Sequence, residues 1–314
     1  MSYAELMGFK QNFGFYDGPQ GMPCNLTIIT LPGATVTITL GAETHTATAN
    51  ADGRASFTIG NAGLWSVVSV KDDVTQVGTV QVENVVTKAL ALPAPLESLT
   101  WSEISAISRA GLAAQNFNIG DTKTFRLSTG EEIIAEIIGF DHDDIDDGSV
   151  ATYGRTKAGI TFQCKKSITA ANRMAAGNNA WDTCEMRLVT LPNIKGQMPQ
   201  ALSGKIANVK KYTSLTFAAT SGIGTTIDNL FVLSRIEVDG TAGQHAGEGE
   251  QYEFYASGRS KQKFNAAGAA IAWWTRSPFI SGSTGYYYGI NSSGVVASYT
   301  PTNTTVSNLF AFCI

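Results

Sequence analysis

The stretch W-W-T-R-S-P-F at 273–279 decides how the C-terminal part of this chain is interpreted. Directly after it, from 281 to 308, Lys, Arg, Asp and Glu are absent, and Gly, Ser, Thr, Asn and a tyrosine triplet dominate. An apolar run, L-F-A-F-C-I, follows at 309–314. Tyrosine offers a large amphipathic contact area at low entropic cost, and small polar residues adapt their hydrogen bonding. The composition therefore indicates a recognition surface between two hydrophobic anchors, with a Gly/Ser-rich loop region that only closes a domain as the alternative.

We expect the ligand-binding residues to lie between 279 and 305 and to carry binding without carrying the fold. One Phe opens the set, and Tyr or small polar residues make up the rest: Phe279, Ser281, Ser283, Thr284, Tyr286, Tyr287, Tyr288, Ser298, Tyr299, Thr302, Asn303 and Thr304.

Further motifs accompany this ending. W-x-x-I-(A/S) lies at 101–105, G-F-x-H-D at 139–143 and L-F-x-L-S-x-x-E at 230–237. Together with W-W-T-R-S-P and the F-A-F-C-I run, they resemble an uncharacterised domain family of phages and gut bacteria. That family resembles the hypervariable phage tail proteins that are diversified by retroelements. The resemblance implies an α+β C-type-lectin-like domain over 99–314, with recognition as its function.

Composition narrows the possible partners. The 314 residues carry a net charge of −4 and no run of Lys or Arg, so nucleic-acid binding is not expected. No stretch approaches the roughly 18 apolar residues of a membrane span, so membrane insertion is not expected either. The first residues show no basic segment followed by an apolar one, so we expect synthesis in the host cytoplasm without a signal peptide.

The chain divides into four predicted parts. Residues 1–21 form an aromatic arm that docks onto a partner or the next domain, with a disordered terminus as the alternative. Residues 22–92 alternate in Val, Ile and Thr between Asp-Gly-type turns, which predicts an all-β Ig-like sandwich of six or seven strands. Residues 93–98 hold two prolines and predict a stiff linker. Residues 99–314 form the recognition domain.

Periodicity predicts the elements of the recognition domain. Its first helix covers 99–110 and ends before Gly111, because Trp101, Ile104 and Ile107 share one face. Further helices are expected at 170–188 and 202–209. Strands are expected at 122–127, 133–140, 159–162, 212–217 and 228–234.

The sequence favours no catalysis and no cofactor. The three histidines lie in different segments, and no nucleophile or dinucleotide motif has the right context. Glu185 and Glu250 could form a glycosidase pair, but sequence alone cannot place them together. The four cysteines have no metal-binding spacing, and Cys313 is expected to be a buried core residue.

The dense acidic segment 141–148 is the remaining metal candidate. It lacks the EF-hand spacing, because Thr152 stands where the loop would need Glu. We therefore favour a polar turn around His142 over a calcium site, and we predict no metal ligands.

Two expectations concern the W-W-T-R-S-P motif. Arg276 is expected to stack on an aromatic ring and to pair internally with Glu185 or Glu250. Trp273 and Trp274 are expected on opposite sides of a strand, one in the core and one toward the recognition loops.

These observations predict a phage tail or fibre-type receptor-binding protein, located in the virion, that attaches to a bacterial surface protein or glycan. The alternative is a structural virion protein, such as a decoration or baseplate subunit, that contacts other virion proteins. A cryptic enzyme is the third class. The resemblance also implies a homotrimer.

Overall fold

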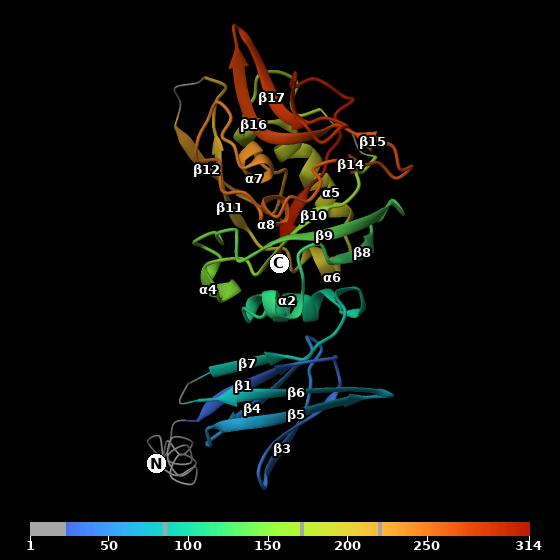
Figure 1. The fold of residues 1–314 in the computed structure, drawn as a ribbon, viewed down its shortest axis with the longest axis vertical. Helices are drawn as coiled ribbons and strands as arrows, with labels where there is room; N and C mark the ends of the chain where they lie inside the picture. Colours follow the sequence, from blue (N-terminus) through green and yellow to red (C-terminus); the bar gives the residue numbers. More distant parts are fainter. Residues whose placement is uncertain (1–22, 84–86, 170–172, 219–221) are drawn as a thin grey trace, which may run out of the picture. The chain divides into compact units, whose positions relative to one another are not determined.

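The computed structural model describes residues 23–83, 87–169, 173–218 and 222–314 (Figure 1). The predicted docking arm, 1–21, lies outside the described residues. The chain forms two compact units, one of Met1–Pro95 with Ser102–Leu112 and one of Leu96–Trp101 with Ala113–Ile314. The first break therefore falls inside the predicted linker, and most of the first predicted helix groups with the first unit.

The first unit holds two sheets, in the strand orders β4-β1-β7 and β3-β2-β5-β6. Strand β1 pairs antiparallel with β4 and parallel with β7. The strands are β1 (Cys24–Ile29), β2 (Thr35–Leu40), β3 (Glu43–Thr48), β4 (Arg54–Ile59), β5 (Gly63–Lys71), β6 (Val74–Val82) and β7 (Thr87–Ala91).

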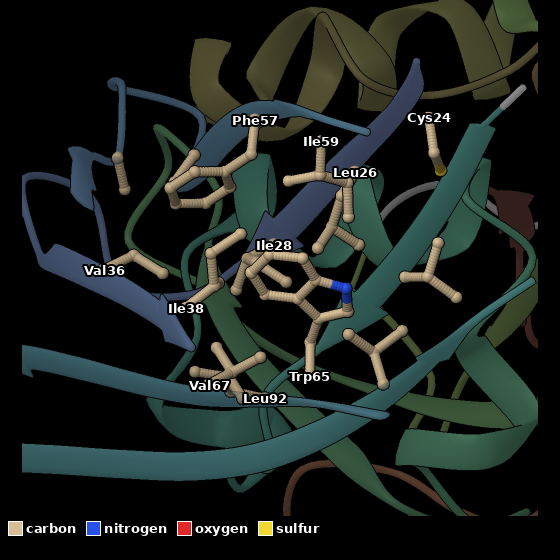
Figure 2. Packing of buried hydrophobic residues seen from close by; sticks show 14 residues of the cluster. Cys24, Leu26, Ile28, Val36, Ile38, Phe57, Ile59, Trp65, Val67 and Leu92 are labelled. Atoms are coloured by element: carbon tan, nitrogen blue, oxygen red, sulfur yellow. The ribbon is translucent and has the colours of Figure 1, made fainter. Parts of the chain in front are cut away.

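The period-two alternation of these strands builds the core of the first unit. Inward side chains from both sheets surround the fully buried indole of Trp65 (Figure 2). Its Nε1 donates to the carbonyl of Asn61 at 3.2 Å, so burial leaves no polar atom of the ring unpaired.

The second unit contains one larger sheet and several small ones. The five-stranded sheet has the order β13-β19-β10-β9-β8, and the others are β11-β12, β14-β15 and β16-β17-β18. Their bounds are β8 (Thr122–Arg126), β9 (Glu132–Phe140), β10 (Ile160–Cys164), β11 (Val209–Ser214), β12 (Ile223–Asp228), β13 (Leu230–Phe231), β14 (Lys263–Phe264), β15 (Ala270–Ile271), β16 (Trp273–Ser281), β17 (Thr284–Ile290), β18 (Val296–Tyr299) and β19 (Ala311–Cys313).

The helices of the described residues are short. They are η1 (Leu96–Ser98), α2 (Trp101–Arg109), α3 (Ala113–Asn116), α4 (Val150–Tyr153), η2 (Trp181–Thr183), η3 (Met186–Thr190), α5 (Leu191–Gln197), α6 (Gln200–Ser203), α7 (Arg235–Asp239) and α8 (Glu253–Ala256). Within the described ranges, none is long and apolar enough to cross a membrane.

The predicted fold class is wrong. The structure is mostly β, with 40% of residues in strands and 17% in helices, in several small sheets of which none is closed. It gives no support for an α+β C-type-lectin-like domain behind an Ig-like sandwich. Two helices of the prediction account for part of the error. In the described part of the first range, 173–188, the helical residues are confined to short turns at η2 and the start of η3. The second range, 202–209, holds the end of α6 and then the start of β11.

The apolar run 309–314 lies in the core of the second unit. All of its residues are fully buried, and β19 lies between β13 and β10 in the five-stranded sheet. Phe312 stacks on Phe162 with ring centroids 5.3 Å apart, and Trp101 meets both rings edge-on. The predicted hydrophobic anchor is therefore part of the main core.

Candidate functional site

The candidate site lies on the sheet β16-β17-β18, whose long hairpin β16–β17 is labelled in Figure 1. Successive side chains of a strand point to opposite faces. In β17, Tyr286 and Tyr288 are therefore on one face and Tyr287 is on the other, which matches their burial.

Register places half of the predicted binding residues on the same face as Tyr286. Phe279 pairs with Tyr286, Ser281 with Thr284, and Tyr288 with Ser298. Each of these side chains is exposed or half-buried. We call this set the outer aromatic face: Phe279, Ser281, Thr284, Tyr286, Tyr288 and Ser298.

The aromatic rings of this face stack on one another. Phe279 lies 4.3 Å from Tyr288 and 5.4 Å from Tyr286, measured between ring centroids, with both pairs near parallel. The guanidinium of Arg235 lies 4.5 Å from the centre of the Tyr288 ring. Such contacts restrict the side-chain rotamers, so little conformational entropy remains to be lost on binding.

The loop that contains Gly243 and Gln244 packs against Tyr288 and β16 at one edge of this stack. A Cβ atom at Gly243 would lie 2.4 Å from a ring carbon of Tyr288, so only glycine permits this approach. The Gln244 carboxamide accepts from the Ile280 N–H at 2.8 Å and donates to the Ile280 carbonyl at 3.4 Å. These contacts hold the loop against the end of β16 that contains Phe279.

The assignment of Tyr287 as a ligand-binding residue is wrong. Its side chain is fully buried, and its hydroxyl donates to the Asn179 carbonyl at 2.6 Å. The ring packs edge-on against Phe217 and Trp274, and burial raises the pKa of its phenol well above the usual value. Tyr287 therefore anchors the sheet to the core.

The remaining candidates lie elsewhere. Tyr299 pairs with Tyr287 across the sheet, shares its face and is half-buried against Trp274. Ser283 lies in the hairpin turn. Thr302, Asn303 and Thr304 belong to the loop after β18, so the structure does not join them to the outer aromatic face.

A buried group of four charges lies in the same unit, and we call it the buried charge cluster: Asp143, Lys211, Glu237 and Arg276. Lys211 Nζ lies 2.6 Å from Asp143 Oδ1 and 2.7 Å from Glu237 Oε1. Arg276 donates to both Glu237 oxygens, at 2.5 and 2.8 Å. Two positive and two negative charges balance, which permits their complete burial.

The pKa values of the cluster follow from this pairing. Burial alone would raise the pKa of Asp143 and of Glu237. Lys211 holds the pKa of Asp143 well below its usual value, and Arg276 with Lys211 lowers that of Glu237. Burial would lower the pKa of Lys211, but Asp143 and Glu237 raise it. All four side chains therefore stay charged at neutral pH.

A β-bulge in β16 contains Arg276, whose side chain points into this cluster. The pairing of β16 with β17 shifts register between Trp274 and Pro278, so Arg276 lies in a bulge. Its backbone N–H donates to the Leu233 carbonyl at 2.8 Å, outside the β16–β17 ladder. This hydrogen bond connects the β16–β17 hairpin to the core at Leu233.

The predicted partners of Arg276 are wrong, although its internal pairing is as expected. Glu185 binds the exposed Arg173 at 2.8 Å, and Glu250 is exposed. The actual partner, Glu237, also caps α7, because its side chain accepts from the Ser234 N–H at 2.8 Å. The L-S-x-x-E motif was the available signal, since Ser followed by Glu three residues later is a capping box.

The prediction for the two tryptophans is wrong in part. Register places them on opposite sides of β16, as expected. Both are fully buried, however, and neither reaches the surface. Trp273 donates to the Lys261 carbonyl at 3.0 Å, while Trp274 packs under Tyr299.

The acidic segment 141–148 distributes its carboxylates over separate cations. Asp141 pairs with Arg155 at 2.9 Å, Asp144 with Lys157 at 3.1 Å and Asp147 with Lys210 at 2.7 Å. Asp143 turns inward to the buried charge cluster. Among the described residues, no three His, Cys, Asp or Glu side chains come together as metal ligands.

All four cysteines are buried and free, and the prediction that Cys313 is a buried core residue is confirmed. Burial raises the pKa of Cys313 well above its usual value, and the neighbouring Asp143 carboxylate raises it further. A thiol in this state is a poor nucleophile.

His245 is buried, and neither ring nitrogen has a hydrogen-bond partner among the described residues. Burial lowers its pKa below the usual 6.5, and Glu248 opposes this in part. Between the two pKa values the unfolded chain binds more protons, so the stability due to neutral His245 is lost as pH falls from about 6.5 through the folded pKa.

We predict that His245→Phe loses less stability than the parent between about pH 7.5 and pH 5. If the melting temperatures of the parent and of His245→Phe fall by the same amount between these two pH values, the prediction is contradicted.

The comparisons with known proteins give one match. The model of a domain of unknown function, DUF6273, matches residues 158–309, a range that contains the whole outer aromatic face and Lys211, Glu237 and Arg276. No curated protein and no solved structure matches the chain.

Sequence reasoning missed two residues of the site. Arg235 stands at a variable position inside the L-S-x-x-E motif, and Gln244 lies in a glycine-rich loop. Neither position carries a sequence signal for contact with β16 or β17, because both contacts depend on tertiary structure.

Proposed function

We propose that this protein binds a bacterial surface ligand non-covalently through the outer aromatic face, as a receptor-binding protein of a phage tail or fibre. The observation that supports this is the stack of Tyr286, Phe279 and Tyr288 on the solvent side of a sheet whose opposite side is anchored by Tyr287. Half-exposed aromatic side chains in a rigid setting are typical of binding hot spots.

The surroundings of the stack also support binding. Ser281, Thr284 and Ser298 flank the rings with exposed hydroxyl groups. These donors and acceptors can adapt to a protein or a glycan, while the rings supply contact area. The face thus combines fixed apolar contact with adaptable polar contact.

A bulky charge placed on the face tests the proposal. Ser298→Glu puts a longer, negatively charged side chain across from Tyr288, and we expect it to weaken attachment to cells of a responsive gut bacterial strain by about tenfold or more. The control is Thr304→Glu, in the loop after β18, which should attach as the parent does. Equal attachment by both variants, or no attachment of the parent to any strain of a broad panel, would contradict the proposal.

A separate observation favours the second candidate function, a structural virion subunit. In the four-stranded sheet of the first unit, the described outward side chains are all uncharged: Thr35, Thr37, Thr39, Thr44, Thr46, Thr48, Leu64, Ser66, Val68, Val70, Thr75, Val77, Thr79 and Gln81. Leu64 and Val77 are 58% and 64% exposed. Strand β6 is moreover an edge strand without Pro, Lys or bulge, the features that usually protect an edge.

We propose that a second copy of this chain covers that face, since two uncharged surfaces meet without repulsion. Four strands about 4.8 Å apart give a footprint of roughly 400 Å² per copy, which is half the standard size, so the association should be weak alone. Sedimentation equilibrium should show concentration-dependent oligomers, up to the trimer that the resemblance implies. Val77→Glu should abolish them, and the control Leu188→Glu, at an exposed apolar position of η3 in the second unit, should not. A parent that stays monomeric at every concentration would exclude this role.

A further inference from the structure

We propose that the ligand of the outer aromatic face is an anionic saccharide, and that Arg235 binds its carboxylate or phosphate group. This inference rests on the proposed function and assigns the chemical class of the ligand. The position of Arg235 carries it, because this side chain is the cation that stacks directly on the face.

The hydrogen-bond donors of Arg235 are free. Its guanidinium donates no hydrogen bond to any described residue, although only 19% of the side chain is exposed. The nearest acceptor, Asp239 Oδ2, lies 3.9 Å from Nε, which is beyond hydrogen-bond distance. A guanidinium has five N–H donors: the Nε of Arg235 is buried without a hydrogen-bond partner, and its two terminal nitrogens remain available to an acceptor of a ligand.

The local charge leaves a positive excess at this place. Asp239 is already engaged by Lys261, whose Nζ lies 2.5 Å from Oδ1. Arg235, Lys261 and Asp239 together carry one net positive charge. The segment 281–308, which supplies most of the face, contains no Asp or Glu to neutralise it.

The surroundings of Arg235 fit a carboxylate or phosphate group that belongs to a sugar. The Cζ of Arg235 lies 4.5 Å from the centre of the Tyr288 ring, and a guanidinium can donate two parallel N–H bonds to a carboxylate or a phosphate. The hydroxyls of Tyr286 and Tyr288 make no hydrogen bond to a described residue, and Ser298 is exposed beside Tyr288. These groups supply the partners that sugar hydroxyls require.

The test compares variants on chemically treated cells. The parent, Arg235→Gln, Tyr286→Ser and the control Arg126→Gln are titrated on a strain that the parent binds. The cells are untreated, amidated at carboxylates with carbodiimide and ethanolamine, or stripped of phosphodiester-linked polymers with cold hydrofluoric acid. Arg126 is exposed, its partners among the described residues are Glu132 and Gly130, and it lies on β8, which belongs to a different sheet from the face.

We expect Arg235→Gln to bind untreated cells about tenfold more weakly than the parent and to melt like it. If the anion is a carboxylate, amidation should weaken the parent to the level of Arg235→Gln without weakening that variant further, because both changes remove the same contact. If the anion is a phosphate, amidation should leave the parent unchanged, whereas the acid removes the phosphodiester-linked polymer itself and should abolish attachment of both the parent and Arg235→Gln.

Three results would overturn the inference, and they separate it from the proposed function. If Arg235→Gln binds like the parent while Tyr286→Ser does not, the face binds a ligand but Arg235 contacts no anion. If Arg235→Gln binds weakly but neither treatment affects the parent, Arg235 only supports Tyr288. If both variants bind like the parent, the proposed function fails together with the inference.

Discussion

Replacing Arg276 by Ala should destabilise the protein by about 3–5 kcal/mol, the usual cost of leaving a buried charge without its partner. The side chain is fully buried and donates to both oxygens of Glu237, to the Val232 carbonyl and to the Tyr212 carbonyl. Its loss leaves Glu237 with Lys211 alone and places an excess negative charge in the core. The bulge of β16 also loses the contact that orients it.

Urea denaturation of the parent and the variant measures this effect. The control is Arg126→Ala, which breaks an ion pair of similar length, 2.6 Å, whose side chains are 65% and 47% exposed. Exposed pairs contribute about 0–1 kcal/mol, so this control should unfold close to the parent. An Arg276→Ala variant that unfolds at the same urea concentration as Arg126→Ala would refute the buried charge cluster.

Adjacent tyrosines of β17 should respond in opposite ways to the same change. Tyr287→Ser removes a fully buried ring and the hydrogen bond to Asn179, and we expect a loss of about 3–5 kcal/mol, as for other buried aromatic truncations. Tyr286→Ser removes a half-exposed ring on the opposite face and should cost at most about 1 kcal/mol.

Thermal melts of the two single variants check this contrast. Similar melting temperatures for both would mean that the assignment of faces in β17 is wrong. The contrast also separates stability from binding, because only the Tyr286 variant should remain folded well enough for attachment assays at ordinary temperature.

Local sequence patterns located several elements of the second unit but not their arrangement. Strands predicted at 122–127 and 133–140 are found as β8 and β9, within one residue at each end. The buried terminal run and the helix around Trp101 also follow from apolar spacing. The fold class could not be predicted, because the sequence of a short strand does not determine with which other strands it pairs.

The candidate site, too, could be predicted only in part from the sequence. Composition singled out the segment that holds the outer aromatic face, yet only register shows that Tyr287 points inward while Tyr286 and Tyr288 point outward. A triplet of identical residues contains no signal for the phase of the strand. Arg235 and Gln244 come from other segments, and only the tertiary structure brings them to the sheet.

Three motifs that lie far apart in the sequence meet in the buried charge cluster. G-F-x-H-D supplies Asp143, L-F-x-L-S-x-x-E supplies Glu237, and W-W-T-R-S-P supplies Arg276. Lys211 completes the charge balance from a segment outside these motifs. The three motifs therefore contribute to one buried network of ion pairs, although they belong to separate elements of the fold.

Attachment of the Phe279→Ser/Tyr286→Ser double variant to bacterial cells tests the central claim most directly. Both side chains belong to the stack and neither is fully buried, so the variant should melt within a few degrees of the parent. Loss of two aromatic hot spots should weaken attachment by about 2 kcal/mol or more, roughly thirtyfold. A variant that remains folded and attaches to cells as strongly as the parent would show that recognition does not use this face.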